Sequence, residues 1–168
     1  MYFETIQQFN KVLGNLDKIL EKAVHHAERK NFDVNNFVGL RLSPDMFPLN
    51  RQIQIATDAA KTIAATLAGK DVPKFEDNET TITQLRERLT KTRSFLSSLK
   101  VGDFVGAGER TVKMTNPAGK GMKAEDALLM RAVPNFYFHV MTVYSLLRMG
   151  GVDIGKKDYL GELPMFEV

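Results

Sequence analysis

Apolar residues recur every three or four positions between residue 4 and about residue 30. They are Ile6, Phe9, Leu13, Leu16, Leu20, Ala23 and Ala27, and the opposite side of the segment carries charged residues. This spacing is typical of an amphipathic helix that packs one face against a core. The pattern therefore predicts a long first helix from Glu4 to about Lys30.

A second helix is predicted from Pro48 to about Ala68. Proline suits the first turn of a helix because it has no N–H to leave unpaired, and Gly69 is a typical stop signal. In the connection before this helix, Ser43 and Pro44 have the pattern of an N-cap followed by proline. That pattern predicts a single helical turn there.

A third helix follows an acidic loop. Thr81 and Gln84 have the spacing of a capping box, in which each side chain accepts a hydrogen bond from the backbone N–H of the other residue. The apolar seam that begins beside them continues to about Lys100. A helix is therefore predicted to start after Thr81 and to end near Lys100.

The stretch after the third helix no longer repeats every three or four residues. Residues 110–114 alternate and include β-branched side chains, and the residues from Asn116 to Gly119 are typical of a turn. A β-hairpin is therefore predicted, with its return strand at residues 120–123. Helical sequence resumes at residues 124–132, and a break or kink is expected at Pro134.

The segment from Pro134 to Gly150 is almost wholly apolar, which predicts a fourth helix buried on several sides. Asn135, His139 and Thr142 form a polar stripe along it, because residues four and seven positions apart share one helix face. Such a stripe is either a hydrogen-bonded core network or the floor of a binding site.

Four amphipathic helices predict an all-α protein, a four-helix bundle with a small β-hairpin between helices 3 and 4. No change in composition divides the chain, so a single domain over residues 1–168 is predicted. The tail, residues 151–168, is too irregular for a helix and too apolar to lie free in water. We expect it to cover an edge of the bundle or a partner subunit.

Composition removes several classes of function. The chain has no cysteine, which excludes disulfides, thiolate nucleophiles and cysteine-rich zinc sites. No signal peptide or membrane-spanning run is evident, and the lack of cysteine fits a reducing compartment, so a cytoplasmic protein without membrane contact is predicted. The net charge of +3 is spread along the chain and gives little reason to expect nucleic-acid binding.

Two interpretations of His139 remain open from the residues alone. In the first, His139 is the general base or the sole imidazole ligand of a small-molecule site. Asn135, Gln54 and Thr142 then contact the ligand, and Tyr137 or Tyr144 lies nearby. In the second, His139 is a hydrogen-bonded core residue of a bundle that catalyses nothing.

Three stretches resemble an uncharacterised bacterial family of the DinB/YfiT-like metalloenzyme superfamily. They are RLSPDMFPLNRQIQ, KFEDNETT, and PNFYFHV followed by VDIGKKDYLG. The resemblance extends from the first helix to Gly161. It implies an up-down-down-up four-helix bundle that is often dimeric, so a homodimer is expected. It also implies a cleft in which the wider superfamily binds a divalent metal through three histidines. Some relatives transfer groups to low-molecular-weight thiols or open small rings.

This chain departs from that histidine pattern. His139, followed by VMTVYSLLR, matches the second of two histidines on the fourth helix, whereas Asn135 stands at the first position. The second helix offers Gln54 or Asp58 where a histidine is expected. Because amide oxygens are poor ligands for zinc or nickel, the resemblance implies a degenerate metal site with His139 and Asp58 as weak candidates.

The predicted function is therefore small-molecule binding in a polar pocket around His139. The alternative is a divalent-metal-dependent transferase or hydrolase of the DinB/YfiT type.

Overall fold

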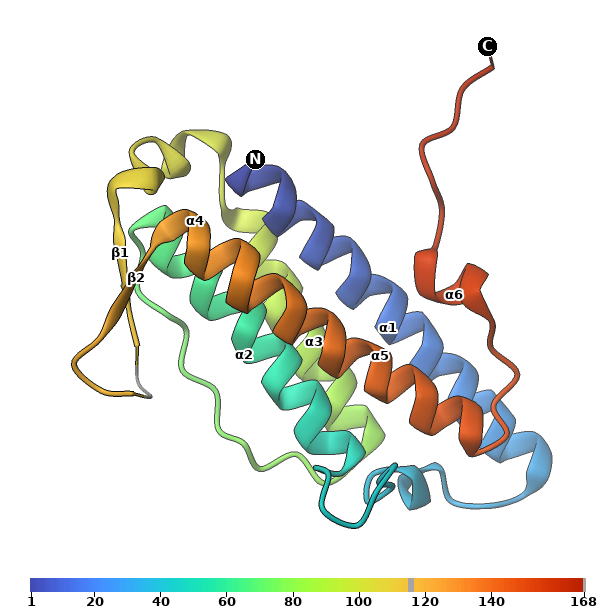
Figure 1. Cartoon of the computed structure of the whole chain (residues 1–168). Helices are drawn as coiled ribbons and strands as arrows, with labels where there is room; N and C mark the ends of the chain where they lie inside the picture. Colours follow the sequence, from blue (N-terminus) through green and yellow to red (C-terminus); the bar gives the residue numbers. More distant parts are fainter. Residues whose placement is uncertain (115–116, 168) are drawn as a thin grey trace.

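Four long helices lie side by side in the computed structural model, which describes residues 1–114 and 117–167 (Figure 1). They are α1 (Tyr2–Lys30), α2 (Leu49–Ala68), α3 (Ile82–Ser98) and α5 (Val133–Met149). α2 packs most extensively against α5, and α3 packs against both α1 and α2. The predicted helical fold is confirmed. In the described ranges, no helix combines the length and the apolar character that crossing a membrane requires.

The apolar seams of these helices meet in one core. Its fully buried members include Phe9, Leu13, Ile53, Ala60, Leu85, Leu89, Phe136 and Val143. The rings of Phe9 and Phe136 lie 4.3 Å apart between centroids, which joins α1 to α5. The small alanines of α2 allow the aromatic-rich helix α5 to approach closely, because interaxial distance depends on the side chains at the contact.

The helix ends follow the sequence signals. α2 begins after Pro48 and ends at Gly69, whose φ of 65° is a left-handed conformation that glycine adopts at little cost. The capping box predicted at the start of α3 is present, with Thr81 Oγ1 accepting a hydrogen bond from Gln84 N at 3.2 Å.

The segment between α2 and α3, residues 69–81, runs back along the bundle (Figure 1). Its last residues lie beside the start of α2, where Asn50 Nδ2 donates a hydrogen bond to Glu79 O at 3.3 Å. Ile82 N, at the start of α3, donates to Asn35 Oδ1 at 2.9 Å. α2 and α3 therefore begin at the same end of the bundle.

The predicted hairpin lies between α3 and α5. Strand β1 (Thr111–Lys113) pairs antiparallel with β2 (Gly121–Lys123), each shorter than the sequence suggested. The predicted turn residue Asn116 lies outside the described residues. Short 3₁₀ helices at Val101–Phe104 and Ala107–Glu109 lead into the hairpin from α3.

The break expected at Pro134 does not occur, since residues 124–149 are all described and all helical (Figure 1). Instead, a short helix α4 (Ala124–Asp126) leads into a π-helical segment (Ala127–Ala132) that joins α5 directly. Proline lacks an N–H and its ring crowds the carbonyl one turn earlier. A wider turn just before Pro134 relieves that crowding and keeps the chain helical.

The connection between α1 and α2 also differs from its prediction. Residues 43–46 form a turn in which Met46 N donates to Ser43 O at 3.0 Å, and not a helical turn. A 3₁₀ helix occurs earlier, at Val34–Phe37, capped by the Asp33 side chain. The sequence signal at Ser43 and Pro44 thus marked a reversal of the chain.

The C-terminal segment contains a five-residue helix, α6 (Lys156–Leu160), where irregular chain was predicted. Asp158 explains it, because Asp158 Oδ2 accepts a hydrogen bond from Gly155 N at 2.8 Å at the start of the helix. Asp158 Oδ1 also lies 2.6 Å from Lys22 Nζ of α1. The helix is therefore capped by a local hydrogen bond and held against α1 by an ion pair with a distant part of the sequence.

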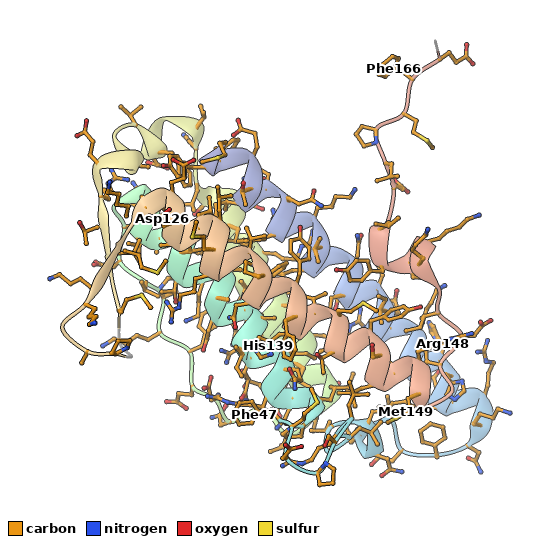
Figure 2. The ribbon with its side chains drawn as sticks, viewed as in Figure 1. Phe47, Asp126, His139, Arg148, Met149 and Phe166 are labelled. Atoms are coloured by element: carbon orange, nitrogen blue, oxygen red, sulfur yellow. The ribbon has the colours of Figure 1, made fainter. Side chains whose placement is uncertain are left out.

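The tail covers the bundle only in its first part. Val152 and Ile154 are buried in the core, as expected of a covering segment. Beyond Gly161 the chain extends away from the helices, and Met165 and Phe166 are each 84% exposed (Figures 1 and 2).

Candidate functional site

His139 lies between α5 and α2, near the connection that leads into α2 (Figure 2). Its Nδ1 is 2.6 Å from Gln52 Oε1, and Gln52 Nε2 donates a hydrogen bond to Phe47 O at 2.9 Å. Because the amide nitrogen must face that carbonyl, the amide oxygen faces the imidazole and accepts from it. His139 Nδ1 therefore carries the ring proton.

The other ring nitrogen of His139, Nε2, then keeps its lone pair. Nε2 makes no hydrogen bond to the described residues, and none of their fully buried side-chain nitrogens or oxygens is unpaired. Nε2 therefore has no partner among the described residues and is not fully buried, although the residue as a whole is only 7% exposed. Burial, and secondly the charge of Arg51, lower the pKa of His139 and keep the imidazole neutral at pH 7. Such a ring can accept a proton or a hydrogen bond from a ligand.

Gln54, the predicted helix-two partner, lies on another side of α2. Gln54 Nε2 donates to Glu79 Oε2 at 2.8 Å, and its oxygen accepts from Arg51 Nη1 at 3.0 Å. The amide that meets His139 belongs to Gln52, which sequence reasoning missed. Residues two apart on a helix point about 200° from each other. The seam of α2 did carry a signal, because Gln52 stands three residues after Leu49 and four before Ala56, on the seam's own face.

Thr142 and Tyr137 make contacts that do not involve His139. Thr142 Oγ1 donates to Phe138 O of its own helix at 2.7 Å, so its proton is already used. The Tyr137 ring packs edge-on against Phe9 of α1, with 6.2 Å between ring centroids, and burial raises the pKa of its hydroxyl. The predicted set of ligand contacts is thus not brought together around His139.

Asp58, the other predicted metal candidate, belongs to a buried ionic cluster. Asp58 Oδ1 lies 2.6 Å from Arg88 Nη2 and 3.1 Å from Lys61 Nζ. The Arg88 side chain is 1% exposed and also contacts Glu79 Oε1 at 3.0 Å and Asp77 Oδ1 at 3.1 Å. This cluster ties residues 69–81 to α2 and α3.

The Arg88 cluster also lowers the pKa of Asp77, in the segment of residues 69–81 between α2 and α3. Burial alone would raise the pKa of Asp77, but the hydrogen bond from Arg51 and the charge of Arg88 outweigh it and lower the pKa. Asp77 therefore stays ionised well into the acidic range.

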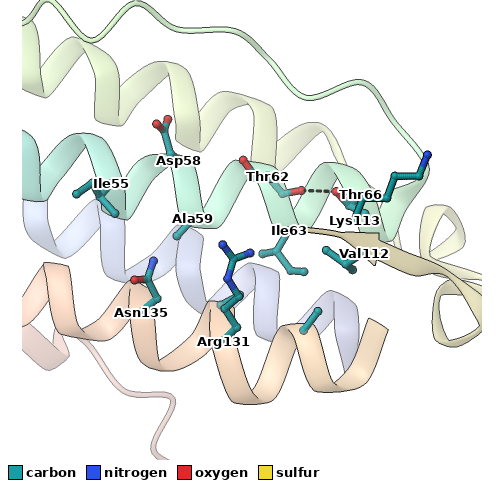
Figure 3. Close-up of a pocket in the computed structure, with 12 residues that line it drawn as sticks. Ile55, Asp58, Ala59, Thr62, Ile63, Thr66, Val112, Lys113, Arg131 and Asn135 are labelled. Carbon is teal, nitrogen blue, oxygen red and sulfur yellow. Dashed lines mark hydrogen bonds between the residues drawn. The ribbon is translucent and has the colours of Figure 1, made fainter. Parts of the chain in front are cut away.

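A groove of about 320 Å³ runs between α2 and the π-helical segment, with β1 beside it (Figure 3). Ala59, Ile63 and Val112 form apolar parts of its wall. Arg131 and Asn135 project into it from the α5 side (Figure 3). Asn135 shares a helix face with His139, which therefore lies one turn beyond the end of the groove.

The donors near His139 do not fit the zinc or nickel ion that the superfamily resemblance implies. Gln52 is held by two hydrogen bonds, Asn135 is a neutral amide, and the charge of Asp58 is balanced by two cations. Zinc sites in proteins take thiolate, imidazole or carboxylate ligands. Within residues 1–114 and 117–167, no three histidine or acidic side chains are grouped closely enough to hold a metal.

A family model and a solved structure both match nearly the whole chain. Residues 1–160 match a family model described as domain of unknown function (DUF1993). The chain is also similar to the crystal structure, at 1.83 Å resolution, of a DinB family member protein from Shewanella denitrificans. The two are 39% identical with a TM-score of 0.94, over 99% of this chain and 95% of the other. No curated protein matches the chain.

Proposed function

This chain belongs to the DUF1993 family and resembles a solved DinB family member, and from that premise we propose that it binds a small molecule between α2 and α5. One observation carries the proposal. The hydrogen bonds that link Phe47 O, Gln52 and His139 Nδ1 fix the His139 ring and leave Nε2 without a partner among the described residues. A histidine that only filled the core would have its polar atoms paired inside the protein.

The groove that ends at Asn135, one helical turn before His139, supplies room for a ligand that reaches toward this nitrogen. Its volume of about 320 Å³ lies at the small end of the usual range for small-molecule sites. His139 Nε2 is the group that accepts a proton or hydrogen bond from the ligand, and the groove wall contacts the ligand's apolar part. This proposal gives no role to a divalent metal, because the available donors are amides and a compensated carboxylate.

Binding of hexanamide, followed by ¹H–¹⁵N NMR, tests the proposal with a neutral probe. We expect shifts confined to amides that line the groove. Ala59→Phe fills the groove and should weaken binding by at least about tenfold. Ser94→Phe, on the exposed side of α3, is the matched control and should bind as the wild type does.

Equal binding by the Ala59→Phe variant, or failure of the wild type to bind either hexanamide or the matching acid hexanoate, would contradict the groove as a site. Zinc and nickel chloride added to the same protein test the metal-dependent alternative. Tight stoichiometric binding that disappears in His139→Ala would favour a transferase or hydrolase.

We propose an up-down-down-up arrangement of α1, α2, α3 and α5. We also propose that the protein is located in the cytoplasm. The return of residues 69–81 to the start of α2 supports the arrangement, since it makes α2 and α3 parallel. The absence of cysteine supports the location.

We further propose that the chain forms a homodimer through its last residues. Leu163, Met165 and Phe166 are 51%, 84% and 84% exposed, and apolar side chains gain stability when a partner covers them. Truncation after Gly161 keeps the buried Val152 and Ile154 and should convert a dimer to a monomer in sedimentation velocity. A full-length chain that sediments as a monomer at micromolar concentration would refute the dimer.

A further inference from the structure

Arg131 is the cationic group at the centre of the groove. Its guanidinium projects from the π-helical segment toward α2 (Figure 3). In the part of the chain that the structure describes, Arg131 forms no ion pair. A charged side chain that faces a cavity without an acidic partner can pair with an anionic ligand.

The π-helical segment places Arg131 in that position. A π-turn adds a residue to the turn, so it changes which side chains face a neighbouring helix, and such turns are frequent at functional sites. Arg131, in the π-helical segment, and Asn135, in α5, both line the groove and lie on one continuous helical stretch. Steric relief ahead of Pro134 accounts for the turn itself, and the position of Arg131 is its consequence.

The charge balance of the groove favours an anion. Its acidic lining residue, Asp58, is already compensated by Arg88 at 2.6 Å and Lys61 at 3.1 Å. Arg131 and Lys113 bring two further positive charges to the lining. The lining of the groove therefore presents a net positive charge to a ligand.

The remaining wall is unsuited to a small inorganic anion alone. Ile55, Ala59, Ile63 and Val112 surround much of the space with hydrocarbon. Burying a ligand's apolar part against such side chains is favourable by roughly 25 cal/mol per Å².

We propose that the groove takes a small carboxylate with an apolar body, whose carboxylate pairs with the Arg131 guanidinium. The planar guanidinium can donate two parallel hydrogen bonds to a carboxylate, which fixes the ligand's orientation as well as its charge. The apolar body then lies along Ala59 and Ile63. This inference rests on the proposed function, because it names the class of ligand for the same groove.

The test compares hexanoate with its neutral isostere hexanamide by ¹H–¹⁵N NMR of the full chain. Hexanoate should bind the wild type at least about tenfold more tightly than hexanamide, with shifts at the groove amides. Arg131→Gln should remove that preference. Arg148→Gln is the matched control, because Arg148 is an exposed arginine near the other end of α5 whose partner is Asp153.

Four other outcomes of these binding measurements would each contradict part of the proposal. Equal binding of hexanoate and hexanamide would overturn the carboxylate inference and leave the groove as a neutral site. A preference that survives in Arg131→Gln would overturn the role of Arg131. Inorganic phosphate that shifts the same amides as strongly as hexanoate would overturn the need for an apolar body. Failure of both hexanoate and hexanamide to bind would overturn the inference and the proposed function together.

Discussion

Replacing Arg88 with methionine should destabilise the folded chain by about 3–5 kcal/mol, because it leaves the nearly buried Glu79 carboxylate without its counter-ion. Arg88 Nη1 and Nη2 contact Glu79 at 3.0 Å and Asp58 at 2.6 Å, and Arg88 Nε donates to Thr57 Oγ1 at 2.7 Å. The Glu79 side chain is only 11% exposed, so water cannot replace the lost contact. Chemical denaturation followed by circular dichroism measures the change in the free energy of unfolding.

Arg86 on the same helix provides the control. Its guanidinium pairs with Asp17 at 2.7 Å, but its side chain is 31% exposed. Exposed ion pairs contribute about 0–1 kcal/mol, so Arg86→Met should have a small effect. If Arg86→Met and Arg88→Met lower the free energy of unfolding equally, then burial does not determine how much the Arg88 cluster contributes to stability.

His139→Leu should cost about 1–3 kcal/mol even though leucine fills the space, because Gln52 Oε1 loses its hydrogen-bond donor. Gln52 is 1% exposed, so its oxygen has no access to water in compensation. His139→Ala should cost more, since it adds a cavity to the same loss. The Gln52→Leu/His139→Leu double variant should be less destabilised than the sum of its single changes. Strict additivity of the two changes would show that the pair is not energetically coupled.

The same leucine variant should change the pH dependence of stability. Burial lowers the pKa of His139 in the folded chain below its ordinary value of 6.5. On acidification the unfolded chain therefore binds this proton first. The histidine's contribution is complete above about pH 6.5 and is lost as pH falls toward the folded pKa. Denaturation of the wild type and His139→Leu across this range should show the difference narrowing at acidic pH. A difference independent of pH would contradict the lowered pKa.

Local sequence patterns were sufficient where structure depends on neighbours along the chain. The seams of the long helices, the stop at Gly69 and the capping box at Thr81 all follow from short-range rules. The short helix α6 was missed because its local start signal, Asp158 three residues after Gly155, has no apolar seam beside it, and its contacts with Asn15 and Lys22 of α1 are distant in sequence. A tertiary contact of this kind leaves no periodic signal.

The candidate site was predictable only in part for a similar reason. His139 stood out as a polar residue in an apolar helix, but its partner depended on which side of α2 faces α5. Gln52 lies on the apolar seam, three residues after Leu49 and four before Ala56, and it was overlooked because the seam was traced through apolar residues alone. Arg131 was missed because no sequence rule applied here predicts a π-helical turn.

The crossover between α2 and α3 also limits how the chain can be shortened. A parallel pair of helices requires the connection to travel the length of α2, which is about 30 Å for its 20 residues. A fully extended chain needs about nine residues for that distance. The connection has thirteen residues, 69–81, so only a few are spare. Insertions there merely lengthen the path across the surface, whereas deletion of more than about four residues would have to unwind the end of α2 or the start of α3.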